Sequence, residues 1–170
     1  MSTMTSKLET AANIAIIVAA LAAATVLTAR AIRPAGADVA TPKGISVGAK
    51  LSMPKLDWQA NGNTLLVAVA KGCHFCSESA PFYKRVIEQA SSRSNLKIVA
   101  IFPDEESEGR NYLSSLGLEM PETRRLPLDQ IGVQGTPTLI LVNGSGVATQ
   151  VWVGKLPPEK ESEVLEKLRV

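Results

Sequence analysis

A long apolar run opens the 170-residue chain and is followed by several short ones. Residues 11–29 (AANIAIIVAALAAATVLTA) carry no charge, and about 20 apolar residues are what a helix needs to cross a bilayer. The run also lacks the polar face of a helix that packs on a globular core. The pattern predicts a transmembrane anchor at 11–30, behind a short tail at 1–10.

The flanks of this run leave its processing and orientation open. Ala35-Gly36-Ala37 resembles a signal-peptide cleavage site, so removal is the alternative to a retained anchor, which the length of the run favours. Lys7 precedes the run, whereas Arg30 and Arg33 follow it. The basic residues therefore do not assign a cytoplasmic side.

Short apolar runs begin beyond residues 31–47, a segment rich in Ala, Gly and Pro that predicts a flexible linker. The domain is expected to span 48–170. Residues 64–70 (TLLVAVA) are continuously apolar, as in a central strand that is covered on both faces. Residues 96–102 (LKIVAIF) predict a second strand of the same kind.

Helical and hairpin patterns fill the remaining chain. Phe82, Val86 and Ala90 recur at helical spacing, and 104–116 opens with the acidic residues that suit a helix start. A final helix is expected after Pro157-Pro158, where Val164, Leu165 and Leu168 supply an apolar stripe. The β-rich runs 138–142 and 147–153, joined by Asn143-Gly144-Ser145-Gly146, predict a hairpin. Together these patterns predict an α/β fold whose central mixed sheet is flanked by helices.

Charge and cysteine content narrow the possible functions. The chain has 18 basic and 16 acidic residues without a long run of one sign, which disfavours a nucleic-acid partner. Its two cysteines are only two residues apart, so they cannot link distant parts of a fold as in small secreted proteins. Their spacing favours chemistry or metal binding.

The segment Cys73-His74-Phe75-Cys76 lies where a strand leads through Gly72 into a helix. A cysteine at a helix N-terminus can have its pKa lowered from about 8.5 to roughly 3.5–7.5, which makes Cys73 a nucleophile at neutral pH. Cys76, one turn later, lies close enough to close a disulfide and resolve an intermediate. The spacing therefore predicts a reversible redox pair.

The residues between the cysteines have weaker interpretations. His74 either stabilises the thiolate when protonated or is an exposed imidazole without a role. Phe75 favours a hydrophobic rim for partner docking. A zinc site normally needs four ligands, and a second pair is missing, so redox chemistry is the preferred interpretation. No phosphate-binding glycine loop is evident, and we expect no cofactor.

Two segments resemble the thioredoxin-like superfamily in order and spacing: TLLVAVAKGCHFCSESAPFYKRV and VQGTPTLILVNGSGVATQVWVGKLPPEKESEVLEKL. The resemblance runs from Ile45 to the C-terminus. It makes Cys73 the attacking cysteine, Cys76 the resolving cysteine and Pro81 the proline of the active-site helix. It also implies a cis bond at Thr136-Pro137, with the Thr136 backbone pairing with an extended substrate chain.

An anchor followed by a linker looks like the membrane-tethered thiol-disulfide oxidoreductases of bacterial envelopes, some of which serve cytochrome c maturation. That resemblance implies a single-pass protein with its domain on the periplasmic side. The implied partners are protein thiols and disulfides, together with a membrane or soluble thiol electron donor.

Two positions depart from family patterns and leave the direction of electron flow open. Val67 stands where thioredoxins carry a buried acid, and Ser79 stands where some envelope reductases have a glutamate. The neighbouring Glu78 is a candidate base, although a solvated carboxylate is the preferred interpretation.

A thiol peroxidase is an alternative function, but Ala70 replaces the threonine that is usual in peroxiredoxins. A metal chaperone using both thiols is another.

Overall fold

The computed structural model describes residues 44–169. The predicted tail at 1–10, the anchor at 11–30 and the linker up to residue 43 lie outside the described residues. No helix within 44–169 is long and apolar enough to cross a membrane.

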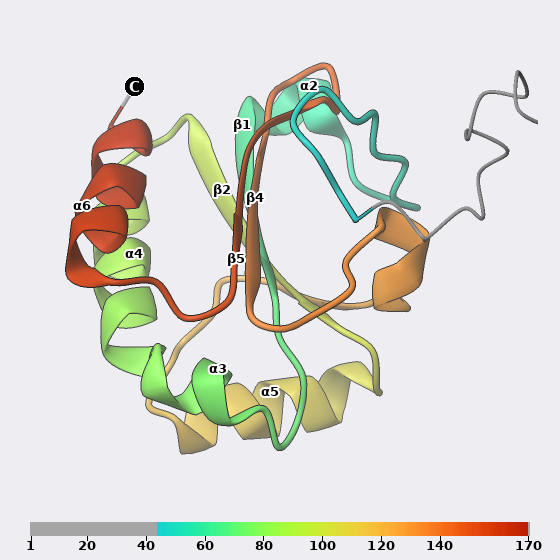
Figure 1. Ribbon diagram of the computed structural model, residues 1–170. Coiled ribbons are helices and arrows are strands. Elements are labelled where there is room, and N and C mark those ends of the chain that lie inside the picture. The colour runs from blue at the N-terminus through green and yellow to red at the C-terminus, as the bar shows by residue number, and fades with distance from the viewer. Residues whose placement is uncertain (1–43, 170) are drawn as a thin grey trace, which may run out of the picture. The chain divides into compact units, whose positions relative to one another are not determined.

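The described chain forms one five-stranded sheet in the order β3-β2-β1-β4-β5 (Figure 1). β1 pairs in parallel with β2 and β2 in parallel with β3, whereas β1–β4 and β4–β5 are antiparallel. The predicted mixed sheet and the predicted hairpin are thus confirmed. The strands are β1 (Asn63–Ala68), β2 (Leu96–Phe102), β3 (Thr123–Arg125), β4 (Thr138–Val142) and β5 (Ala148–Val153).

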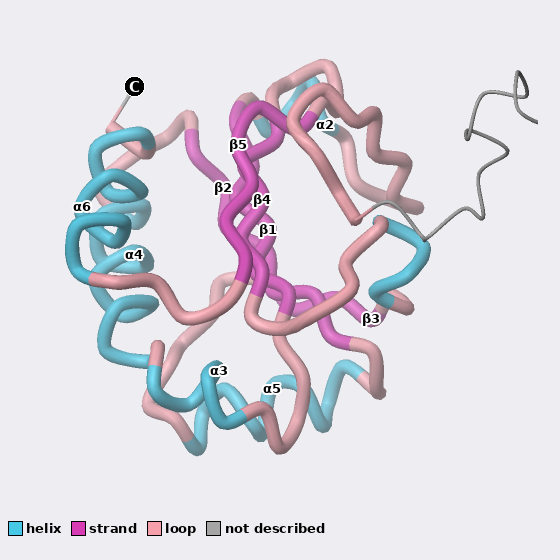
Figure 2. Tube along the Cα trace, in the orientation of Figure 1, coloured by secondary structure: helices cyan, strands magenta, loops and turns pink. Residues whose placement is uncertain are grey.

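Helices lie before, between and after the strands, except that β4 leads through a turn directly into β5 (Figure 2). α4 and α6 run side by side, where the Gln89 side-chain amide donates to the Leu165 carbonyl at 2.6 Å and Arg85 pairs with Glu161. The helices are α2 (Trp58–Asn61), α3 (His74–Glu78), α4 (Ala80–Ser91), α5 (Glu106–Ser115) and α6 (Pro158–Lys167), with a 3₁₀ turn η1 (Leu128–Ile131).

Two apolar clusters sandwich the sheet because successive side chains of a strand point to opposite faces. On β1, Leu65 and Val67 belong to the cluster beneath α4, α5 and α6, whereas Leu66 and Ala68 belong to the cluster on the other face. All four are fully buried. This burial on both faces explains the continuous apolar run that predicted a central strand.

The last strand residue of β1 is Ala68, two residues earlier than predicted. Val69 still donates to the Ile101 carbonyl at 3.0 Å, but the chain then turns, and the Cys73 N–H donates to the Ala70 carbonyl at 3.3 Å. Gly72 occupies this turn at φ +74°, a conformation that glycine adopts without steric cost. The turn delivers the chain to the first cysteine.

The short edge strand β3 was not predicted. It has only three residues, of which Thr123 is buried. Arg124 pairs with Glu122, and Arg125 pairs with Glu105. β3 follows α5, so the segment after β2 forms a helix and returns as an additional parallel strand at the sheet edge.

The residues before α2 pack on the domain as well. Ile45 donates to the Gly132 carbonyl at 2.7 Å, and Gly48 donates to the Ala148 carbonyl at 2.8 Å. Three apolar side chains of this segment are buried in the cluster on the face opposite α4 and α6, namely Leu51, Met53 and Leu56. Within residues 44–169, the first of these backbone hydrogen bonds is that of Ile45.

Candidate redox site

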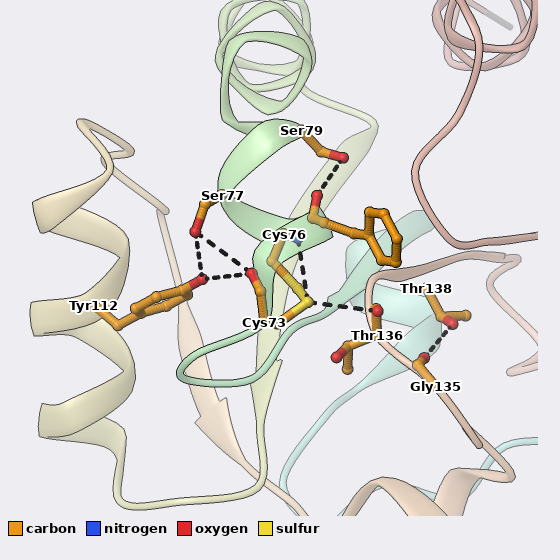
Figure 3. Close-up of a disulfide and its surroundings, with 9 residues drawn as sticks. Cys73, Cys76, Ser77, Ser79, Tyr112, Gly135, Thr136 and Thr138 are labelled. Carbon is orange, nitrogen blue, oxygen red and sulfur yellow. Dashed lines mark hydrogen bonds between the residues drawn. A yellow bond between two sulfur atoms is a disulfide. The ribbon is translucent and has the colours of Figure 1, made fainter.

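The two cysteines lie at the start of α3 and are joined by a disulfide (Figure 3). Their Cα atoms are 5.2 Å apart. Cys73 is the N-cap residue, and its Sγ accepts the backbone N–H of Cys76 at 3.1 Å. The prediction of a cysteine at a helix N-terminus is confirmed, and this N–H is available to stabilise a thiolate at Cys73.

Burial distinguishes the two sulfur-bearing residues. Cys73 is partly exposed, whereas Cys76 has no exposed surface and belongs to the apolar cluster that contains Val67 and Phe82. A molecule approaching from solvent therefore reaches Cys73 before Cys76.

The loop that precedes β4 forms a second wall beside Cys73. The Thr136–Pro137 peptide bond is cis, as the resemblance implied. The Thr136 carbonyl oxygen lies 3.4 Å from the Cys73 Sγ. The Thr138 hydroxyl donates to the Gly135 carbonyl at 2.7 Å (Figure 3). This hydrogen bond links the two ends of the segment that contains the cis bond.

A third contact comes from α5, and sequence reasoning missed it. The Tyr112 hydroxyl donates to the Cys73 carbonyl at 3.3 Å and lies 3.2 Å from the Ser77 hydroxyl (Figure 3). The partners are 39 residues apart in the sequence, and no local pattern marked Tyr112 as a site residue.

Glu78 lies at the rim in an ion-pair network. Its carboxylate lies 3.1 Å from the Lys155 ammonium and 3.3 Å from the His74 Nε2. The hydrogen bond from Lys155 lowers the pKa of Glu78 below its usual range. This keeps the carboxylate ionised at neutral pH and makes it a weak proton acceptor.

The two residues between the cysteines, His74 and Phe75, are exposed. The His74 side chain is 77% exposed, and its ring lies 5.8 Å from that of Phe75, which is itself 54% exposed. The suggested influence of His74 on a thiolate stays a prediction.

The core side of the site contains no buried carboxylate among residues 44–169. Over the whole of this range, the buried residues with short polar side chains are Thr64, Ser79, Thr123 and Thr138. Val67, at the position of the thioredoxin acid, is fully buried among apolar side chains. Ser79 donates its hydroxyl to the Phe75 carbonyl at 2.8 Å. Burial raises the pKa of the nearby Tyr83 hydroxyl, so it stays protonated.

The sheet order, the helix-capping cysteine pair and the cis-proline loop define a thioredoxin-like domain. The thioredoxin-like domain family matches residues 58–169, and the chain belongs to this family. No curated protein matches the sequence.

Solved structures share the fold at low sequence identity. A protein assigned as a thiol:disulfide interchange protein DsbE from Chlorobium tepidum has 20% identity and a TM-score of 0.58, with 74% of this chain and 97% of that chain covered. A thiol-disulfide isomerase from Corynebacterium glutamicum has 15% identity and a TM-score of 0.52, covering 73% and 92%. StoA from Bacillus subtilis has 14% identity and a TM-score of 0.52, covering 73% and 96%. At these identities the similarity shows a shared thioredoxin-like fold.

Proposed function

We propose that this thioredoxin-like protein exchanges disulfides with cysteines of partner proteins, with Cys73 as the attacking sulfur and Cys76 as the resolving one. The observation that carries the proposal is the difference in burial between the two cysteines of one disulfide. Because Cys73 alone is partly exposed, a partner sulfur can bond only to Cys73 without opening the core.

The exchange balances in two steps. In the oxidising direction, a partner thiolate attacks the Cys73 sulfur, the Cys73–Cys76 bond breaks, and Cys76 leaves as a thiolate that takes up a proton. A second partner thiolate then attacks the partner sulfur of the mixed disulfide and releases Cys73. In the reducing direction the same bonds form and break in reverse, and the partner disulfide is the oxidant.

Thr136 and Pro137 support the docking of an extended chain in this proposal. The Thr136 carbonyl lies within 3.4 Å of the reacting sulfur, so backbone groups of a bound segment would meet this loop beside the disulfide. Phe75 supplies exposed apolar surface to the same partner.

We also place the domain outside the cytoplasm, behind a membrane anchor at 11–30. The uncharged run supports the anchor, and protein disulfides persist mainly in oxidising compartments. A membrane-impermeant maleimide applied to intact cells should label the reduced cysteine pair. Labelling only after cell lysis would reject this placement.

The test of the exchange uses the full chain with Cys73→Ser or Cys76→Ser. We expect Cys73→Ser to abolish disulfide exchange with a model protein disulfide. Cys76→Ser should instead accumulate a mixed disulfide, because the resolving sulfur is missing. Persisting exchange in Cys73→Ser, or equal trapping by both variants, would contradict the assigned roles.

A further inference from the structure

Helix α5 reaches the redox site through the side chain of Tyr112. The Tyr112 hydroxyl donates to the Cys73 carbonyl at 3.3 Å, and the Ser77 hydroxyl lies within hydrogen-bond distance of both oxygens (Figure 3). Tyr112 is partly buried, so this contact lies between α5 and the start of α3 rather than in open solvent.

The Cys73 carbonyl is also where α3 begins. It accepts the backbone N–H of Cys76 at 3.1 Å and that of Ser77 at 3.2 Å. The orientation of this carbonyl therefore sets the backbone of Cys73, and with it the position of the sulfur that accepts the Cys76 N–H.

The position of Tyr112 is itself fixed by packing against the sheet. Its ring lies 5.8 Å from the ring of Phe102, a fully buried residue at the end of β2. Gly109, one turn earlier in α5, allows the close approach, because a Cβ there would lie 2.9 Å from the Phe102 Cγ. The hydroxyl is thus presented by a close-packed helix, not by a mobile loop.

We propose that Tyr112 is a positioning residue that holds the Cys73 backbone at the start of α3 and thereby stabilises the dithiol form of the redox pair. In the disulfide form, the covalent bond to Cys76 already fixes Cys73. That bond is absent in the dithiol form, so there the hydrogen bond from Tyr112 contributes more to keeping the sulfur beside the Cys76 N–H. Tyr112 acts through Cys73 and does not touch the partner sulfur.

The test compares the full chain and its Tyr112→Phe variant in detergent micelles. Tyr112→Phe removes the hydroxyl and keeps the ring against Phe102. We expect the equilibrium with glutathione to shift towards the disulfide by roughly two- to threefold. This is less than the effect of a whole ordinary hydrogen bond, because the hydroxyl contacts the Cys73 carbonyl in the disulfide form as well. The pKa of the Cys73 thiol, followed by thiolate absorbance in the reduced protein, should rise in parallel.

Ser115→Ala is the matched control. Ser115 is on the same helix and donates its hydroxyl to the Tyr112 carbonyl at 2.6 Å, so the variant removes a hydrogen bond of α5 without touching Cys73. It should leave the glutathione equilibrium and the thiol pKa unchanged. Ser77→Ala should be non-additive with Tyr112→Phe, because both hydroxyls meet at one carbonyl.

A Tyr112→Phe protein with lowered unfolding stability but an unchanged equilibrium and thiol pKa would overturn the proposal, since Tyr112 would then be only a packing residue. The inference rests on the proposed redox function. If the unsubstituted chain does not equilibrate with glutathione, the function itself fails, and that result is distinct from a normal equilibrium in both proteins.

Discussion

The solvent side and the core side of the candidate redox site differ in exposure and in hydrogen bonding, although one disulfide joins them. On the solvent side, Cys73 is partly exposed and is surrounded by hydrogen-bonding groups from Thr136 and Tyr112. On the core side, Cys76 is fully buried in the apolar cluster with Val67. The polar groups that touch this pair thus gather around one sulfur-bearing residue.

One short motif can therefore give its two cysteines different chemical surroundings. Accessibility and hydrogen bonding favour attack at Cys73, whereas burial keeps Cys76 out of reach of a partner in solvent. The division arises from the fold, because one cysteine caps the helix and the other faces the sheet.

The largest effect is expected from placing a charge on the core side. Val67→Asp should lower the free energy of unfolding by at least about 3 kcal/mol at neutral pH, because the carboxylate would have no partner in the apolar cluster. Burial would raise the pKa of the introduced carboxyl, so the loss should shrink as acid neutralises it. Urea unfolding at pH 7 and pH 4 measures both.

Val153→Asp is the solvent-side control, since Val153 is 64% exposed at the end of β5. Its effect should be within about 0.5 kcal/mol. An equal loss of unfolding free energy in the two variants would mean that the core side is accessible to water, which would contradict the proposed difference between the two sides.

A smaller effect of opposite sign is expected at Thr64, a fully buried residue of β1. Its hydroxyl has no hydrogen-bond partner. Thr64→Val should therefore stabilise the protein by about 1 kcal/mol, since it removes an unsatisfied polar group at nearly constant volume. Thr149→Val is the control, because that hydroxyl donates to the Leu141 carbonyl at 3.1 Å, and its loss should destabilise. Thermal unfolding of both variants measures these changes in stability. A loss of stability in Thr64→Val would contradict the expectation.

The smallest effect belongs to Glu78 on the solvent side. A carboxylate with a lowered pKa adds stability above its unfolded value of 4.5 and loses that contribution as the pH falls through its folded value. Glu78→Gln should therefore have a lower unfolding stability than the unsubstituted chain at pH 7 and an equal one at pH 3. Added salt should remove the difference at pH 7, because the ion pair with Lys155 is exposed. Denaturant unfolding at pH 3 and pH 7, at low and high salt, measures this. A stability difference that persists at high salt would show that the Glu78–Lys155 pair is shielded from solvent ions.

Much of the fold could be predicted because its elements have strong local patterns. β2 has the predicted bounds 96–102, and the helix after the cysteines buries Phe82, Val86 and Ala90 as expected. These positions repeat with the period of their own element, so burial can be read from spacing. The cysteine pair was equally local, since four residues carry it.

The missed features depend on contacts between distant segments. β3 has two arginines among its three residues and no alternation, and only the edge of β2 makes it a strand. Tyr112 looks like an ordinary residue of an amphipathic helix, because its partner at Cys73 is brought near by the sheet. Packing of this kind leaves no periodic signal in a single sequence.

The shortness of β3 has a consequence for self-association. A protein that binds extended chains, as proposed for this one, needs a sheet edge that does not recruit another copy of itself. β3 offers only three residues of edge backbone, with the charged pairs of Arg124 and Arg125 beside it. Such a short, charged edge is a poor template for adding a neighbouring strand, so this side of the sheet is protected against edge-to-edge aggregation.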